Sequence, residues 1–267
     1  MVKPAAPEAP RLSLAVITFN EEKHLPRLLE AARNFADEVV VVDSGSTDAT
    51  VAIARSHGAR VIESDWPGFG RQKQRALEEA RGEWVLSLDA DELPDAQLTE
   101  SLAAVARGEG DEFDGYAMDR LTAYQGEYIR HAWSPDWVLR LVRRGRGRWT
   151  DRPVHEALVV DGSVGRLKGK LLHDSYENLA DHYTRLVAYS RLSAESAYAR
   201  GRRFHWSQLL LRPPAAFLRR FLLKRGFLDG VRGLLVAGAT AVGAFMKYAF
   251  LYEYQRERRI EQKEGER

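Results

Sequence analysis

The sequence predicts an α/β fold with a mostly parallel sheet flanked by helices, followed by a helical, basic C-terminal region. Three observations predict it. Short apolar or β-branched segments alternate with helix-length segments over roughly the first hundred residues. Polar or acidic residues directly follow several of the apolar segments, and Arg and Lys crowd the second half of the chain. Strands that alternate with helices of this length are typical of βαβ units, which build parallel sheets.

The composition is that of a folded chain. Its 267 residues are enough for one large α/β domain with an appendage, and 45% apolar residues supply a core. The absence of cysteine excludes disulfides and thiolate metal sites. With 40 basic and 38 acidic residues the net charge is +2, which argues against a general nucleic-acid-binding protein.

Three strands are expected before the first acidic segment, at residues 12–18, 38–42 and 60–63. The second is β-branched throughout, which predicts burial on both faces. Helices are expected between the strands: one carries apolar residues at helical spacing from Leu25, the next runs to about His57, and the third covers residues 69–80. The βαβ order therefore continues up to the fourth strand.

The fourth strand, Val85 to Leu88, runs directly into three carboxylates, Asp89, Asp91 and Glu92. Two carboxylates separated by one residue can hold a hard divalent cation through oxygen ligands. The alternative is a strand followed by an acidic helix cap, with Asp91 or Asp95 starting the next helix. Asp-x-Asp alone leaves both interpretations open.

Residues 18–21, 43–46 and 89–91 each follow a predicted strand, so they gather at one edge of a parallel sheet. That edge, at the carboxyl ends of the strands, is where open α/β sheets bind ligands. No Gly-x-Gly-x-x-Gly follows the first strand and no Walker-type loop is present, which argues against dinucleotide and P-loop sites.

These segments carry a family resemblance. Ile17-Thr18-Phe19-Asn20-Glu21-Glu22, Val41-Val42-Asp43-Ser44-Gly45-Ser46-Thr47-Asp48 and Asp89-Ala90-Asp91, in that order, resemble family 2 glycosyltransferases of the GT-A (Rossmann-like) fold. Within that family the chain is similar to the branch of lipopolysaccharide core glucosyltransferases. The match covers residues 12 to about 175.

The resemblance implies a donor site for a nucleoside-diphosphate sugar. Asp91 is expected to ligate Mg²⁺ or Mn²⁺, with Asp89 sharing the metal or lying nearer the ribose. Asp43 is expected to bind the nucleobase or ribose, and either Arg71 or Lys73 the diphosphate. The residues expected to bind the nucleotide sugar are Thr18, Asn20, Glu21, Asp43, Arg71, Lys73 and Asp89.

Each donor-site residue has a structural alternative. Asp43 could open an ordinary turn. Asn20 and Glu21 could be a helix cap and a first-turn acid. Arg71 and Lys73 could lie on a solvated helix face.

An inverting transferase needs a carboxylate that deprotonates the acceptor hydroxyl. Glu156 is the first choice for this base and Asp136 the second. His155 or His173 could complete the metal shell, although a lone histidine can equally be a hydrogen-bonded structural residue.

The predicted organisation has four parts: a flexible tail at residues 1–10 without the apolar core of a signal peptide, a catalytic domain at 11–177, a helical region at 178–254, and a charged tail at 255–267. The helical region mixes apolar runs with Arg and Lys, and Pro213-Pro214 is expected to break it. The uncharged run Gly233–Met246 is short of the ~20 residues that span a bilayer. Basic residues beside apolar ones favour an anionic membrane surface, and a helical subdomain packed on the domain is the alternative.

The sequence therefore predicts a cytoplasmic enzyme, peripheral on the inner (plasma) membrane. It is expected to move a hexose, glucose by resemblance, from a nucleoside-diphosphate sugar to a lipopolysaccharide inner-core or similar glycolipid acceptor, with inversion. One alternative is the same fold acting on a polyprenyl phosphate or peptide acceptor. The other is a non-catalytic nucleotide-sugar binding module.

Overall fold

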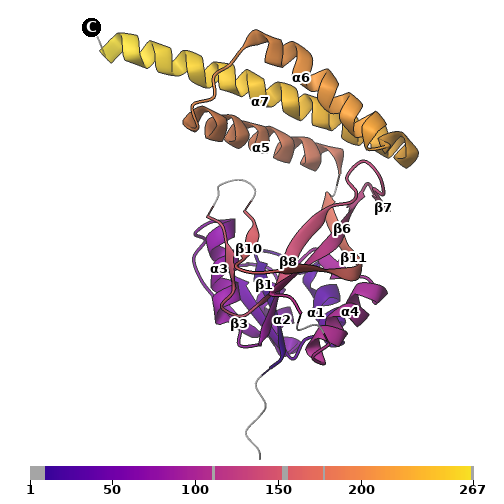
Figure 1. Ribbon diagram of the computed structural model, residues 1–267. Helices are drawn as coiled ribbons and strands as arrows, with labels where there is room; N and C mark the ends of the chain where they lie inside the picture. Colours follow the sequence, from indigo (N-terminus) through magenta and orange to yellow (C-terminus); the bar gives the residue numbers. More distant parts are fainter. Residues whose placement is uncertain (1–9, 110–111, 152–155, 177, 266–267) are drawn as a thin grey trace, which may run out of the picture. The chain divides into compact units, whose positions relative to one another are not determined.

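The structure is a computed structural model that describes residues 10–109, 112–151, 156–176 and 178–265 (Figure 1). It divides into two compact units. The sheet unit comprises Met1–Arg120 and Asp136–His173, and the helical unit comprises Leu121–Pro135 and Asp174–Arg267.

The sheet unit is built on four parallel strands in the order β3-β2-β1-β4. Their bounds are β1 Leu12–Thr18, β2 Glu38–Asp43, β3 Arg60–Glu63 and β4 Trp84–Asp89. The connecting helices are α1 Leu25–Ala32, α2 Thr50–Ser56 and α3 Phe69–Glu79. The predicted α/β core is confirmed, with strand bounds within a residue of those expected.

Strands β1 and β2 are buried on both faces. Along β1, Leu14 and Val16 pack into one apolar cluster, while Ala15 between them packs into the other. In β2, Val41 and its neighbour Val42 divide between the clusters in the same way. Since successive side chains of a strand point to opposite faces, a run without polar residues is what a sheet covered on both sides requires.

Beyond β4 the paired strands with recorded register are antiparallel, and the sheet continues in the order β8-β6-β11-β5. The bounds are β5 Glu92–Pro94, β6 Gly115–Tyr124, β8 Trp137–Arg143 and β11 Val164–Tyr176. A separate two-stranded sheet pairs β9 Gly147–Trp149 with β10 Leu158–Val160, and α4 spans Ala96–Ala106. Asp95 caps α4 by accepting the backbone N–H of Leu98, as one alternative for this segment predicted.

The helical unit contains three helices, α5 Leu179–Ala199, α6 Trp206–Leu218 and α7 Gly230–Gly265, with α5 and α6 packed along α7 (Figure 1). The turn between α6 and α7 consists of two short helical segments, η1 Arg219–Leu223 and η2 Gly226–Asp229. A short strand, β7 Glu127–Tyr128, pairs with the end of β6.

Two features of the helical unit differ from expectation. Pro213 and Pro214 lie inside α6, which continues through them; they remove two backbone donors but do not end the helix. Helix α7 continues past Lys247 and through most of the segment expected to be a tail. One stretch of the described chain, Gly226–Arg258, is therefore long and apolar enough, by length and composition, to cross a membrane.

Candidate functional site

The polar segments that follow β1, β2 and β4 meet at one edge of the sheet, as predicted. In the parallel ladders Thr18 lies opposite Asp43, and Ile17 lies opposite Asp89. The two acids therefore flank the carboxyl end of the central strand. This is the position at which open α/β sheets bind their ligands.

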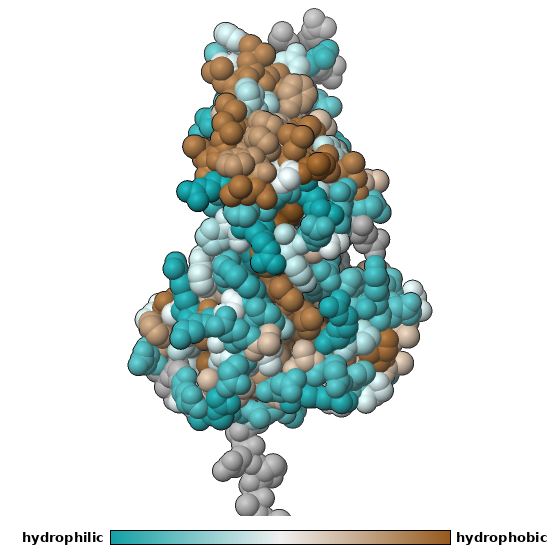
Figure 2. Space-filling view, turned by 90° about the vertical axis from the view of Figure 1, so that its right-hand side faces the viewer, coloured by the Kyte–Doolittle hydropathy of each residue, from teal (hydrophilic) through white to brown (hydrophobic). Residues whose placement is uncertain are grey.

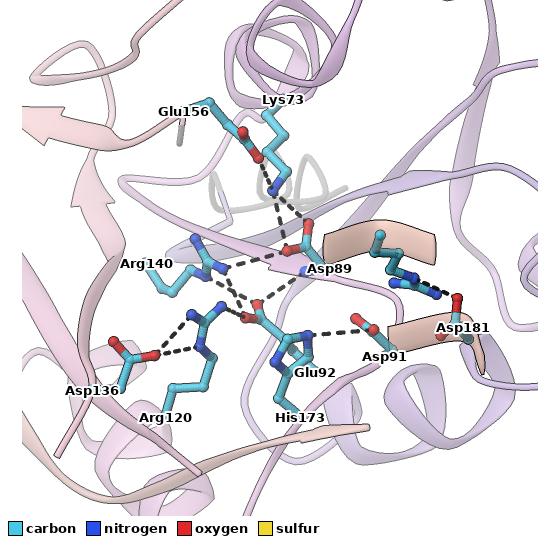
Figure 3. Close-up of polar contacts among 11 residues, drawn as sticks. Lys73, Asp89, Asp91, Glu92, Arg120, Asp136, Arg140, Glu156, His173 and Asp181 are labelled. Carbon is cyan, nitrogen blue, oxygen red and sulfur yellow. Dashed lines mark hydrogen bonds and ion pairs between the residues drawn. The ribbon is translucent and has the colours of Figure 1, made fainter. Parts of the chain in front are cut away.

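Lys73 joins two carboxylates at this edge (Figure 3). Its Nζ lies 2.8 Å from Oδ1 of Asp89 and 3.2 Å from Oε1 of Glu156. The lysine comes from the buried face of α3, and its ammonium also lies 4.9 Å from the ring centre of Trp149. A helix, a strand end and the segment around residue 156 thus converge on one cation.

Arg140 and Arg120 extend the cluster. Arg140 makes a two-pronged contact with the fully buried Glu92, at 2.7 and 3.0 Å, and its Nη2 lies 3.4 Å from Asp89. Arg120 lies 3.4 Å from Glu92 and 2.8 Å from Asp136. The contacts form an alternating chain of charges: Asp136, Arg120, Glu92, Arg140, Asp89, Lys73, Glu156 (Figure 3).

Neighbouring opposite charges determine the ionisation states of the residues in this cluster. Burial opposes the charged forms of Asp89 and Glu92, but the neighbouring cations outweigh it and lower the pKa of both carboxyls. Burial also opposes the charge on Lys73 and Arg140, yet the carboxylates around them raise the pKa of each. All four groups are therefore charged at neutral pH.

The charges do not balance. Four carboxylates alternate with three cations, and Asp91 adds a fifth carboxylate near them, so the carboxylates outnumber the Lys and Arg side chains by two. An excess of negative charge repels a diphosphate unless a cation enters with it. The electrostatics of the edge therefore match a donor that binds together with a divalent metal ion.

Asp91 and His173 are the residues that fit this metal. Asp91 Oδ2 lies 3.4 Å from Nε2 of His173, and neither side chain is fully buried (Figure 3). The described residues contain no cluster of three or more His, Asp or Glu that could by itself enclose a metal ion. Mg²⁺ at phosphate sites needs only one or two protein ligands, because the phosphates supply others. His155, the other histidine expected here, lies outside the described residues.

Asp89 has a different environment from Asp91. Its two carboxylate oxygens contact Lys73 and Arg140, and its backbone N–H donates to Glu92. This geometry favours a role for Asp89 in holding the cluster together. The expectation that it shares the metal or touches the ribose stays a prediction.

The two candidate bases differ in their partners. Glu156 shares Lys73 with Asp89 and so belongs to the acidic edge itself. One oxygen of Asp136 accepts hydrogen bonds from two nitrogens of Arg120, at 2.8 and 3.0 Å. Asp136 is linked to Asp89 through Arg120, Glu92 and Arg140. The geometry favours Glu156 as the base.

Of the two cations expected at the diphosphate, the structure brings only Lys73 to the acids. Arg71, two residues earlier on α3, is exposed and pairs with Asp151 at 2.9 Å. Two residues along a helix correspond to about 200°, so the two side chains leave opposite faces. The solvated-face alternative therefore describes Arg71 and not Lys73.

Asp43 is buried and already satisfied by protein donors. One oxygen accepts the backbone N–H groups of Gly45 and Ser46, and the other accepts the hydroxyls of Thr18 and Ser46. A carboxylate has about four acceptor positions, so these contacts leave little capacity for a nucleobase. The geometry favours the turn alternative, in which Asp43 and Thr18 shape the pocket. Direct binding stays a prediction.

Asn20 and Glu21 connect the loop after β1 to the loop after β2. Asn20 donates its backbone N–H to Ser46 Oγ and accepts the N–H of Thr47, and its φ of 55° lies in the left-handed region that asparagine tolerates. Glu21 donates its N–H to Thr50 Oγ1. Neither residue starts α1, which begins at Leu25, so the helix-cap alternative was wrong.

Sequence reasoning missed the buried pair of Glu92 and Arg140. A signal was present: Arg140 lies between Leu139 and Leu141 within an apolar strand, where an unpaired guanidinium would be costly. Trp149 lies near the cations of both Lys73 and Arg140. A charged residue inside an apolar strand predicts a buried partner, but not its identity.

Comparisons with known proteins identify the family of the chain. The family model for glycosyl transferase family 2 matches residues 13–163. The chain is 34% identical to the lipopolysaccharide core biosynthesis glycosyltransferase LpsC of Rhizobium meliloti, over 91% of this chain and 92% of that protein.

Two of the solved structures similar to the chain contain a bound nucleotide sugar. One is S. aureus TarS in complex with UDP-GlcNAc, with 16% identity, 92% of each chain covered and a TM-score of 0.48. The other is the Mycobacterium tuberculosis glucosyl-3-phosphoglycerate synthase with Mn²⁺ and UDP-glucose, with 26% identity, 44% of this chain and 45% of that chain covered, and a TM-score of 0.33. On the family model and the LpsC match, the chain belongs to glycosyl transferase family 2 and has the GT-A fold.

Proposed function

We propose that this transferase moves glucose from a nucleoside-diphosphate glucose to a lipopolysaccharide inner-core or similar glycolipid, with inversion and with Mg²⁺ or Mn²⁺. The observation that carries the proposal is the acid-rich cluster at the carboxyl edge, in which the buried Lys73 joins Asp89 to Glu156 and Asp91 lies 3.4 Å from His173. The similarity to LpsC, a lipopolysaccharide core biosynthesis glycosyltransferase, supports the acceptor class.

Asp91 and His173 would hold the metal ion together with the donor diphosphate. A metal bound there supplies positive charge that stabilises the departing diphosphate. Asp89 does not need to contact the donor for this, because its carboxylate keeps Lys73 and Arg140 in place. Thr18 and Asp43 hold the loop after β2, and Asn20 and Glu21 fix it to the loop after β1.

Glu156 takes the role of general base. Its carboxylate accepts the proton of the acceptor hydroxyl as that oxygen attacks the anomeric carbon on the face opposite the leaving diphosphate. Lys73 contributes by fixing the position of Glu156 relative to Asp89. A single carboxylate on the acceptor side is what an inverting displacement requires.

The helical unit takes the role of membrane attachment. It combines exposed apolar side chains with an excess of Arg and Lys, which suits an anionic surface. A glycolipid acceptor lies in a bilayer, so a transferase that docks on the cytoplasmic face of the inner membrane would meet donor and acceptor together.

The test is a transfer assay. The full chain is incubated with nucleotide sugars, Mn²⁺ or Mg²⁺, and vesicles carrying truncated lipopolysaccharide core, and the product is analysed by NMR for the linked sugar and its anomeric configuration. The proposal predicts transfer of glucose in the inverted configuration. Transfer to a polyprenyl phosphate or a peptide only, or a retained configuration, would contradict it. Donor binding without transfer to any acceptor would favour a binding module.

A further inference from the structure

The turn between α6 and α7 exposes a group of large apolar side chains. We call it the apolar tip: Leu218, Leu222, Leu223, Phe227, Leu228 and Val231. Leu223 is 81% exposed and Val231 73% exposed. Figure 2 shows that apolar residues gather over the helical unit on the side that faces the viewer. Scattered apolar residues need no explanation, but six within fourteen consecutive positions do.

Specific hydrogen bonds hold the turn that carries the apolar tip. The buried carboxylate of Asp229, at the end of η2, accepts the backbone N–H groups of residues 130, 131 and 132 at 2.7–3.1 Å. Its Oδ1 also lies 2.9 Å from Nδ1 of His131, and Arg220 Nη1 donates to the carbonyl of Ala132 at 2.6 Å. The turn is therefore fixed at both η1 and η2 while its leucines point outward.

Two glycines allow the chain to close so tightly at the tip. A Cβ at Gly233 would lie 1.7 Å from the carbonyl oxygen of Gly226, and a Cβ at Gly226 would lie 2.8 Å from that of Arg220. Backbone therefore packs directly on backbone where α7 begins. A turn held in this way cannot fold its leucines inward without breaking these contacts.

The chain that leads into and forms the tip is rich in positive charge. Residues 196–228 contain eight Arg and Lys and no Asp or Glu, and the next acid, Asp229, is used by the contacts above. Just after the tip, Arg232 pairs with Glu127 at 3.0 Å, and the other cations of the tip segment exceed the acids there in number. Such a cluster needs an anionic counterpart.

The charge pattern selects the counterpart. A second copy of this chain would place the same cation-rich surface opposite itself, and like charges facing each other are unfavourable. An anionic bilayer supplies phosphates for the cations and hydrocarbon for the leucines at the same time. Among the flanking cations, Arg219, Lys224 and Arg225 fall between the tip residues in the sequence.

Helix α7 is less suited to crossing the bilayer than the tip is to entering it. Val236, Ala237 and Leu251 are buried within the helical unit, and Ser190 of α5 donates to the carbonyl of Gly243. Helix α5 carries an ion pair between Asp181 and Arg185. Spanning would either pull α7 away from α5 or carry these charges into hydrocarbon, which is costly.

We infer that the apolar tip inserts into the interfacial layer of an anionic phospholipid bilayer, with its flanking cations on the lipid phosphates and α7 outside the hydrocarbon core. The inference deepens the proposed membrane attachment of this transferase. It assigns the attachment to one turn of the helical unit and excludes a spanning mode.

The experiment uses the absence of cysteine from the chain. Leu223→Cys, Val242→Cys and Val187→Cys are each labelled with the fluorophore NBD and mixed with vesicles of phosphatidylglycerol and phosphatidylcholine. Nitroxide lipids then report depth. The inference predicts that only the label at 223 brightens and is quenched by shallow nitroxides. Equal quenching at 242 by deep nitroxides would show a spanning α7 and overturn it.

A second arm measures partitioning by vesicle co-sedimentation. Leu222→Ser/Leu223→Ser is expected to lower the partition coefficient at least about tenfold, because two leucines leave hydrocarbon, whereas the matched exposed pair Leu179→Ser/Val187→Ser is not. Vesicles of phosphatidylcholine alone should bind the wild type weakly. Unchanged partitioning of the tip variant, equal binding to neutral vesicles, or a wild-type dimer that the tip variant abolishes would each overturn the inference.

The outcome is separable from that of the proposed function. Donor hydrolysis in solution, without vesicles, should be the same in the tip variant as in wild type, because the tip contributes no residue to the acidic edge. Loss of vesicle binding with intact hydrolysis supports the inference. A wild type that binds vesicles through the tip but hydrolyses no donor would contradict the proposed function alone.

Discussion

The two units of this chain treat charge in opposite ways. In the sheet unit, buried cations and carboxylates alternate, and each of Lys73, Arg140 and Arg120 contacts two acids. In the helical unit, a long segment carries only cations beside exposed leucines. Internal pairing positions groups for chemistry, whereas an uncompensated surface is available to a partner. Under the proposed function, the sheet unit carries the reaction and the helical unit carries the attachment to the membrane.

The largest expected effect of a substitution is on the general base of the sheet unit. Glu156→Gln should lower kcat by about 10²–10⁴-fold, because the acceptor proton then has no carboxylate to receive it. Asp136→Asn, at the far end of the ionic chain, is the matched control and should lower kcat much less. Steady-state transfer kinetics with saturating donor give both values, and a larger loss in the Asp136 variant would reassign the base.

The second largest effect concerns the buried pair. Arg140→Met leaves Glu92 buried without its two-pronged partner, which should cost about 3–5 kcal/mol of unfolding free energy. Arg55→Met removes a comparably short contact, 2.6 Å to Glu63, but on the exposed surface, where the loss should be at most about 1 kcal/mol. Urea unfolding of both variants makes the comparison, and similar losses would show that the buried chain is not a structural requirement.

Within the helical unit, the anchor, which is the set of contacts of Asp229 with residues 130–132, should respond to substitution differently from the apolar tip. Asp229→Ala leaves three backbone N–H groups without their acceptor and should cost about 1–3 kcal/mol. Leu223→Ser, on an already exposed side chain, should change stability by no more than about 0.5 kcal/mol. Hydrogen exchange at residues 130–132 reports the anchor. If serine at 223 loosened it as much as alanine at 229, the tip would be part of the core.

The smallest effect is a difference in acid response. The folded-state pKa of His182 is lowered by burial, so its contribution to stability is complete above its unfolded value near ~6.5 and declines as pH falls below it. The lowered pKa values of Asp89 and Glu92 contribute above about pH 4 and are lost below it. As the pH is lowered, hydrogen exchange should show that the helical unit loosens before the sheet unit does. His182→Gln should reduce this early loss of protection in the helical unit.

The sequence was sufficient to predict the parallel core, because each of its strands is a short apolar run with a polar end. This pattern is local in the sequence and can be recognised without knowing the partners of the strand. It was sufficient for the acidic edge as well, since consecutive parallel strands must end on the same side. The antiparallel half was less predictable. The extent of strand β6, Gly115–Tyr124, depends on partner strands that are distant in sequence.

The ion-pair partners of the buried charges could not be predicted from the sequence, because the paired residues are also distant in sequence. Arg140 lies 48 positions from Glu92, and Lys73 lies 83 positions from Glu156. Composition shows that such charges exist but not which ones meet. Pro213-Pro214 misled in the other direction, since the two prolines remove donors from α6 without ending it. The helical unit also includes Leu121–Pro135, which lies far from the rest of that unit in the sequence.

The most direct test of the account is metal-dependent donor binding. UDP-glucose, among a panel of nucleotide sugars, is titrated calorimetrically into the wild type, Asp91→Ala and the exposed-acid control Asp161→Ala, with and without Mn²⁺. The account predicts binding that requires metal, is lost in Asp91→Ala and persists in Asp161→Ala. Undiminished binding by Asp91→Ala, or equal binding without any divalent ion, would contradict it.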